Sequence, residues 1–237
     1  MKVCSSDYSM CYYPPVRHTN AHCTLTELVG EHIRAHFDSD LVPSLGQFLL
    51  ARLTPYPYLR FPLFPSSLSL SSFSTDLPRD SILTPGMMID LIGPCGAAIE
   101  ESRERERVLL IADDSPAVLL PFASSAIARA GAATLILAQP YPLDSLDPRI
   151  EIHRGDLITL TNELAPHADR IFIHLSHPSP LTHHASLVTH HAYTLLTPPT
   201  PCGVGACHAC YIKTNHGHKM SCLDGPFFNL QSLISNY

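Results

Sequence analysis

The sequence has few charged residues, no excess of basic ones and no long apolar run. Charged residues make up 15% of its 237 positions, below the quarter that is usual for globular proteins. With 15 lysines and arginines against 21 aspartates and glutamates, the formal charge is −6, which leaves no basic surface for nucleic acid. No apolar stretch approaches the roughly 20 residues that span a bilayer. The first residues also lack the apolar core of a signal peptide, so we expect no membrane span and a cytoplasmic location, where thiols stay reduced.

Proline is the residue in excess. The chain has 22 prolines, about twice the average frequency, which favours short elements joined by many turns. At 237 residues, the chain is long enough for one large domain or two modest ones. Together with the low charge, this composition predicts a surface that is partly covered by a partner.

Four cysteines near the end of the chain carry the strongest signal. Cys202, Cys207 and Cys210 are followed by Cys222, and this C-x4-C-x2-C…C spacing is the plant-type [2Fe-2S] pattern. Each iron needs two thiolates, so three ligands come from one tight loop and a fourth closes the site from a neighbouring strand. The glycines between the first two cysteines let the backbone take positive φ angles close to the sulfides. We therefore predict that these four cysteines bind a [2Fe-2S] cluster.

A structural zinc site is the rival interpretation of the same cysteines. Zinc sites made of four cysteines usually draw on two C-x2-C-type pairs, whereas this motif contains one, Cys207 with Cys210. The spacing therefore favours iron and sulfide. Cys95 is expected to be a small buried residue. No spacing of serine, histidine, aspartate or cysteine predicts a catalytic residue, so we assign none.

The first part of the chain, before the cysteine motif, has the sequence pattern of a β-rich region. Residues 1–24 are polar and without period, and they are expected to form an irregular lead-in. From residue 25 onward, short strand-like runs at 47–53, 68–70 and 87–92 are separated by proline and glycine turns. Several short strands with such turns predict a small antiparallel barrel.

Residues 100–107 form a charged run, which is expected to be helical and to serve as a solvated face or a linker. The sequence pattern changes after this run. Strands are expected at residues 108–111, 134–137, 150–153 and 171–174, and helices at 116–130, 156–164 and 178–191. Strands that alternate with helices predict a parallel sheet, as in nucleotide-binding domains.

This order of barrel, α/β domain and cysteine motif resembles the electron-transfer subunit of dihydroorotate dehydrogenase, within the ferredoxin reductase superfamily. Four segments carry the resemblance: Gly46-Gln47-Phe48, the run from Thr84 to Gly96, the loop from Pro201 to Cys210, and the run from Ser221 to Phe228. The first two are similar to the family's P-G-Q-F strand and to the segment that ends its barrel. The last two are similar to its cluster loop and closing strand. The resemblance implies FAD on the barrel and NAD on the α/β domain.

Both nucleotide motifs of that family are altered in this sequence. The stretch from Phe61 to Phe64 stands where the family has an arginine for the flavin pyrophosphate, and Arg60 would point to the other face of the strand. Asp113 and Asp114 stand where the family has a glycine-rich phosphate loop, and carboxylates there repel phosphate. FAD thus stays possible, and NAD(P) binding is not expected.

We therefore predict a ferredoxin-reductase-like antiparallel β-barrel, a βαβ parallel-sheet domain and a C-terminal [2Fe-2S] module. The expected parts are a lead-in arm (1–24), a flavin-type barrel (25–105), a degenerate NAD-type domain (106–198) and a cluster module (199–237). The predicted function is one-electron transfer to or from a partner redox subunit within a hetero-oligomeric oxidoreductase. Two alternatives stay open: a complete FAD and [2Fe-2S] subunit that links nicotinamide to a dihydroorotate-dehydrogenase-like partner, and a non-redox scaffold with a structural zinc site.

Overall fold

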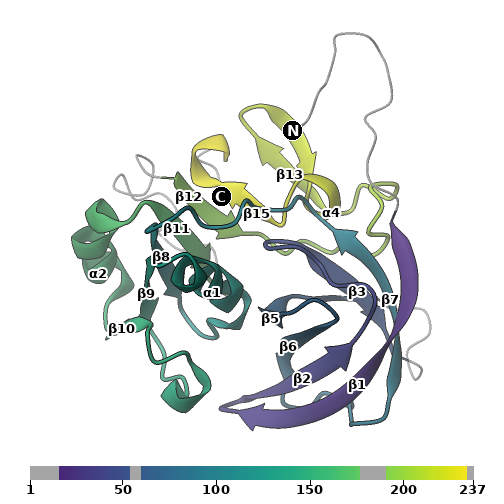
Figure 1. The fold of residues 1–237 in the computed structure, drawn as a ribbon. Coiled ribbons are helices and arrows are strands. Elements are labelled where there is room, and N and C mark those ends of the chain that lie inside the picture. The colour runs from purple at the N-terminus through teal and green to yellow at the C-terminus, as the bar shows by residue number, and fades with distance from the viewer. Residues whose placement is uncertain (1–15, 54–59, 177–190, 234–237) are drawn as a thin grey trace.

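The computed structural model describes residues 16–53, 60–176 and 191–233, which form two large sheets and a small hairpin (Figure 1). The first sheet has seven antiparallel strands in the order β4-β3-β7-β1-β2-β6-β5. Its strands are β1 (Arg17–Val29), β2 (His32–Asp38), β3 (Phe48–Arg52), β4 (Phe61–Leu63), β5 (Pro65–Leu68), β6 (Ser72–Pro78) and β7 (Met88–Cys95). Because β4 and β5 are consecutive in the chain but lie at opposite edges of the sheet, the sheet must curl round, which confirms the predicted barrel.

Strand β1 corrects the irregular lead-in expected up to residue 24. From Arg17 onward the chain pairs with β7 and then with β2. Ala21 and Cys23 point into the barrel core while their polar neighbours face outward. The polar composition thus reflects one solvent-facing side of a strand. The strand expected at 68–70 is also wrong, since Leu70 lies fully exposed in the turn between β5 and β6.

The second sheet has six strands in the order β10-β9-β8-β11-β12-β15. They are β8 (Arg107–Ala112), β9 (Ala132–Leu137), β10 (Glu151–Arg154), β11 (Arg170–His174), β12 (His191–Leu195) and β15 (Phe227–Asn229). The first five are parallel to one another, and β15 runs antiparallel to β12. The predicted parallel sheet is therefore confirmed, and the four strands expected from residue 108 to residue 174 lie within two residues of their expected bounds.

Helices cover both faces of this sheet. One face is covered by η1 (Ala117–Leu119) and α1 (Leu120–Ala128), and the other by α2 (Leu157–Leu164) and η3 (Ala165–His167), while η2 (Leu143–Ser145) follows β9. The helices expected at 116–130 and 156–164 are thus confirmed, and the one expected at 178–191 falls mainly on residues outside the described ranges. Within the described ranges, no helix has the length and apolar character needed to cross a membrane.

The charged run at 100–107 is not a helix, which corrects the prediction. It is an irregular connection between the two sheets, and Arg105 takes a positive φ of 57° that a right-handed helix excludes. Glu106 is 6% exposed and forms an ion pair with Arg170 at 2.6 Å. Only Ser102 and Glu106 of this run are buried, so it remains a largely solvated linker, as expected, with Glu106 turned inward against β11.

The C-terminal segment packs against both domains. It contains β13 (Tyr211–Thr214), β14 (Gly217–Met220), α4 (Ser221–Asp224), β15 and η5 (Leu230–Ser232), drawn in yellow in Figure 1. Phe227 packs its ring on Phe122 and Phe172, with centroid distances of 4.9 and 6.2 Å. Since β15 is also a strand of the second sheet, the module is joined to the α/β domain instead of forming a separate unit.

A buried polar network links the barrel to the α/β domain. Arg34 of β2 donates to both carboxylate oxygens of Asp76 on β6, at 2.7 and 3.1 Å, and to the hydroxyl of Tyr141 at 2.9 Å. Tyr141 follows β9 and in turn donates to Asp76. Burial, reinforced by the charge of Asp76, raises the pKa of Tyr141 to about 12. Because these groups come from both domains and supply one another's hydrogen-bond partners, the network helps to hold the two domains together.

Candidate iron–sulfur centre

The loop that carries three of the four predicted ligands lies between β12 and β13. Gly203 and Gly205 have φ angles of 68° and 73°, in the left-handed region. A Cβ on Gly203 would lie 2.7 Å from the side chain of Leu50, and one on Gly205 would lie 2.4 Å from that of Leu223. Both positions therefore need glycine for conformation and for space, as the sequence predicted.

The four cysteines meet in two pairs. The sulfurs of Cys210 and Cys222 are 3.4 Å apart, and the thiols of Cys202 and Cys207 also interact. Cys222 lies in the short helix α4, not on a strand as the sequence suggested. Within the described ranges, no group of three or more His, Cys, Asp or Glu side chains is placed to hold one metal ion. A [2Fe-2S] cluster needs two protein thiolates at each of its two irons, and two thiol pairs supply that number.

Backbone N–H groups point at the sulfurs of this loop. Burial opposes ionisation of Cys202, but hydrogen bonds from the backbone of Cys207, Val204 and Ala206 prevail and lower its pKa to about 7. At Cys222, burial dominates and raises the pKa to about 12, although the backbone of Gly205 donates to its sulfur. Donors of this kind stabilise thiolate and sulfide charge, so the donor set fits an iron–sulfur cluster.

One side of the centre is open. Cys210 and Cys222 are each 1% exposed, while Cys202 is partly exposed and Cys207 is exposed. Val204, at 46% exposed, leaves an apolar side chain at the surface of the loop. Residues of the barrel and of the C-terminal segment thus cover one pair of cysteines and leave the other at the surface.

The edge of the second sheet where the family binds nicotinamide is closed by hydrogen bonds within the protein. The carboxylate of Asp113, just after β8, accepts from the backbone N–H of Ser176 at 2.8 Å and from its hydroxyl at 3.2 Å. His174 lies beside it and contacts the carbonyl of Ser115 at 3.1 Å, and burial lowers its pKa. The Asp113 carboxylate therefore occupies the N–H and the hydroxyl of Ser176 as hydrogen-bond donors. Its negative charge also repels phosphate.

The described residues at the flavin position are paired or packed within the protein. Arg60 donates to Asp90 at 2.6 Å, so the cation next to the altered motif is already paired. Phe64 packs on Phe48 with ring centroids 5.3 Å apart. Between Phe64 and α1 there is a cavity of about 10 Å³, room for about one water molecule. We therefore assign FAD no role in the electron transfer proposed below.

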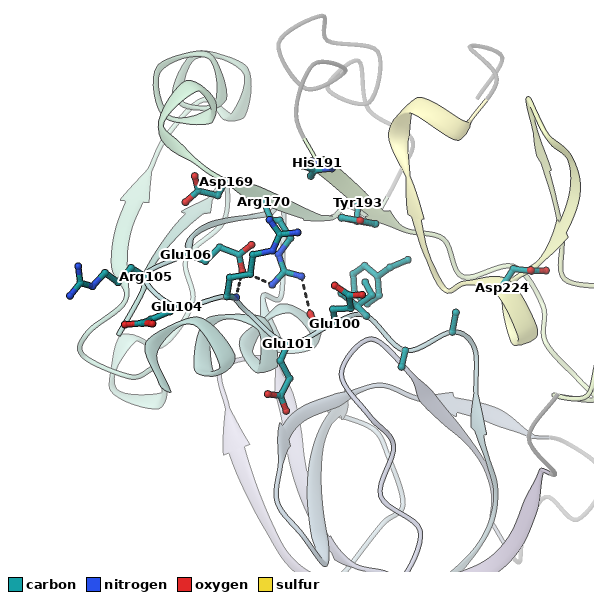
Figure 2. Close-up of a pocket in the computed structure, with 15 residues that line it drawn as sticks. Glu100, Glu101, Glu104, Arg105, Glu106, Asp169, Arg170, His191, Tyr193 and Asp224 are labelled. Carbon is teal, nitrogen blue, oxygen red and sulfur yellow. Dashed lines mark hydrogen bonds and ion pairs between the residues drawn. The ribbon is translucent and has the colours of Figure 1, made fainter. Parts of the chain in front are cut away.

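A larger hollow lies at the opposite edge of the second sheet, at the amino ends of β8, β11 and β12 (Figure 2). It encloses about 700 Å³. Arg170 lies within it and donates to Glu106 at 2.6 Å and to the carbonyl of Glu100 at 2.9 Å. Its carboxylates outnumber its arginines; they belong to Glu100, Glu101, Glu104, Glu106, Asp169 and Asp224. Because an acidic lining repels phosphate, this hollow does not suit the phosphates of a nucleotide.

Fold and site together define an iron–sulfur protein with a ferredoxin-reductase-like fold. Residues 201–234 match the family model of the iron–sulfur cluster binding domain of dihydroorotate dehydrogenase B. A stretch of 28 residues is 61% identical to the electron transfer subunit of dihydroorotate dehydrogenase B (NAD(+)) from Clostridium perfringens, and it covers 12% of this chain and 11% of that protein. The sequence match thus spans about a tenth of the length of this relative.

Solved structures extend the likeness to the whole fold. The structure of NADH-dependent reduced ferredoxin–NADP oxidoreductase, described for flavin-based electron bifurcation, has a TM-score of 0.72 and 18% identity, over 90% of this chain and 89% of that chain. The ferredoxin reductase in carbazole 1,9a-dioxygenase has a TM-score of 0.58 and 12% identity, over 72% and 64%. Likeness at such low identity establishes the fold and not the activity. The predicted fold and iron–sulfur module are confirmed.

Proposed function

We propose that this chain is the electron-transfer subunit of a multi-subunit oxidoreductase. In this proposal, Cys202, Cys207, Cys210 and Cys222 hold a [2Fe-2S] cluster, and the chain relays single electrons without binding NAD(P). The observation that carries the proposal is that these cysteines, three from the loop and one from α4, form two thiol pairs within the segment that matches the iron–sulfur family model. A cytoplasmic location stays a prediction from the sequence.

The protein around the loop has three tasks in this function. A bound cluster supplies one-electron acceptor and donor chemistry. The N–H groups of Val204 and Ala206 hold negative charge on sulfur. Phe48 and Leu50 of the barrel pack with Cys210 and Cys222 and exclude water from that pair. Cys207 stays exposed, so a partner's redox centre can approach from that side.

Metal and flavin analysis of the protein isolated with its native partners separates this proposal from its alternatives. Iron and acid-labile sulfide without flavin support the relay. Iron with bound FAD would favour a complete flavin and cluster subunit, for which the ferredoxin-reductase-like fold speaks. Zinc in a colourless protein would favour a structural site and contradict the proposed function.

NADH and NADPH are expected neither to bind nor to reduce this chain. Asp113 places a carboxylate where a dinucleotide phosphate would need bare backbone donors, and it already uses the N–H of Ser176. Glycine at both Asp113 and Asp114 is not expected to restore binding. The C-G-P motif that the resembled family has near the nicotinamide is matched here by Ser176-His177-Pro178, without its cysteine and glycine. Calorimetry checks this, and micromolar affinity of the unaltered protein for either nucleotide would refute it.

The chain is expected to work inside a stable complex in which residues 202–210 lie close to a partner's redox centre. Val204→Asp should weaken co-purification and electron transfer while leaving the cluster bound, because it places a charge on the exposed apolar part of the loop. Leu70→Asp is the matched control, since Leu70 is exposed in the turn between β5 and β6, outside the cluster loop. Full activity of an isolated monomer with a small diffusible donor and acceptor would count against this arrangement.

A further inference from the structure

A fifth cysteine lies directly beneath the cluster loop. Cys95 is the last residue of β7, pairs in register with Phe48 and is 1% exposed. It belongs to the same buried apolar cluster as Cys210 and Cys222. The barrel therefore contributes a sulfur to the surface on which the C-terminal module rests.

The thiol of Cys95 contacts the loop next to Cys202. Its Sγ donates to the carbonyl of Gly203 at 3.6 Å. A Cβ built on Gly203 would lie 3.1 Å from the same sulfur, so loop and thiol are in close contact. On its other side, the backbone N–H of Gly96 donates to the carbonyl of Cys222 at 2.7 Å. Cys95 thus lies between chain segments that carry two proposed ligands.

A buried cysteine does not necessarily contact the cluster loop, as a second buried cysteine shows. Cys23 is also fully buried, but it lies in the separate core of the barrel. Its thiol contacts the carbonyl of Leu25 on its own strand at 3.8 Å. A residue that only fills space at position 95 needs no sulfur, whereas the thiol of Cys95 donates to the carbonyl of Gly203, the residue after Cys202.

We propose that Cys95 is a fifth sulfur of the iron–sulfur centre, which holds the loop at Gly203 and replaces Cys202 as an iron ligand when Cys202 is lost. In the replacement, Cys95 gives its proton to solvent and an Fe–S bond forms, so one thiolate takes the place of another and no electron is transferred. The inference rests on the proposed function, because it requires a bound cluster.

The test compares variants of the full chain, isolated anaerobically with its partners. Cys202→Ala is expected to keep most of its iron and sulfide, with altered g values in the EPR spectrum of the reduced protein. Cys202→Ala combined with Cys95→Ala should lose both, and the combination with Cys95→Ser should also lose them, because serine keeps the size but binds a soft cluster poorly. Cys202→Ala combined with Cys23→Ala should behave like Cys202→Ala alone.

Cys207→Ala supplies the comparison within the loop. Cys207 is exposed, and its loss should empty the site even with Cys95 present. If Cys202→Ala is as empty as the double variant with Cys95→Ala, while the unaltered chain is loaded and circular dichroism shows both variants folded, the proposal is overturned. An unaltered chain that carries no iron overturns the proposed function first, so the two failures are distinguishable.

Discussion

Replacing Cys207 with serine is expected to remove the visible absorption of this protein together with its iron and acid-labile sulfide. The unaltered chain should carry the metal and sulfide of one [2Fe-2S] cluster. Serine offers a harder oxygen ligand that holds the softer iron–sulfur core poorly. Since Cys207 is exposed, the substitution leaves the packed core untouched. Absorption spectroscopy with iron and sulfide analysis of anaerobically purified protein measures the loss.

His208→Asn is the control for the Cys207 variant. His208 neighbours Cys207, is exposed and has a φ of 59°, a conformation that asparagine tolerates better than most residues. Its side chain contacts Tyr211 at 2.9 Å. The variant is expected to keep the cluster. One bound zinc and no iron in the unaltered protein would contradict the prediction for both variants.

Arg34→Met is expected to lower the free energy of unfolding by about 3–5 kcal/mol, because removing one partner of a buried ion pair leaves the other charge uncompensated. The side chains of Arg34 and Asp76 are 10% and 3% exposed. Tyr141 loses its arginine donor as well. Urea denaturation followed by circular dichroism measures the change.

Arg79→Met is the matched control for a surface ion pair. Arg79 and Glu31 are 3.3 Å apart with side chains 59% and 84% exposed, and such pairs contribute about 0–1 kcal/mol. Tyr141→Phe should cost roughly 1–2 kcal/mol, as for a lost buried hydrogen bond. An Arg34→Met protein as stable as the Arg79→Met protein would show that the domains do not depend on this network.

The sequence was most informative where a pattern is local. The apolar run of β8 and the start of α2 after Asp156 lie where the sequence predicted them. In both, neighbouring residues decide the structure: a short apolar run forms a buried strand, and the Asp156 carboxylate accepts the N–H of Thr159 at the start of the helix.

Predictions failed where a distant partner decides the structure. The charged run before β8 has a helix-like composition, yet Glu106 turns inward because Arg170 lies opposite it on β11. The polar start of β1 reads as irregular, yet the strand forms because β7 offers it unpaired backbone groups. Neither partner is near in sequence, so composition and period could not reveal them.

The sequence by itself determined the chemistry of the site, because the spacing of Cys202, Cys207, Cys210 and Cys222 with glycines between them is a local property of the chain. Only the tertiary structure decided that these cysteines pair as 202 with 207 and 210 with 222. It alone also placed Cys95 beneath the loop and the Asp113 carboxylate on Ser176. The contacts of Cys95 and Asp113 join residues that are tens of positions apart, and they form because the two sheets and the C-terminal module bury a common apolar surface.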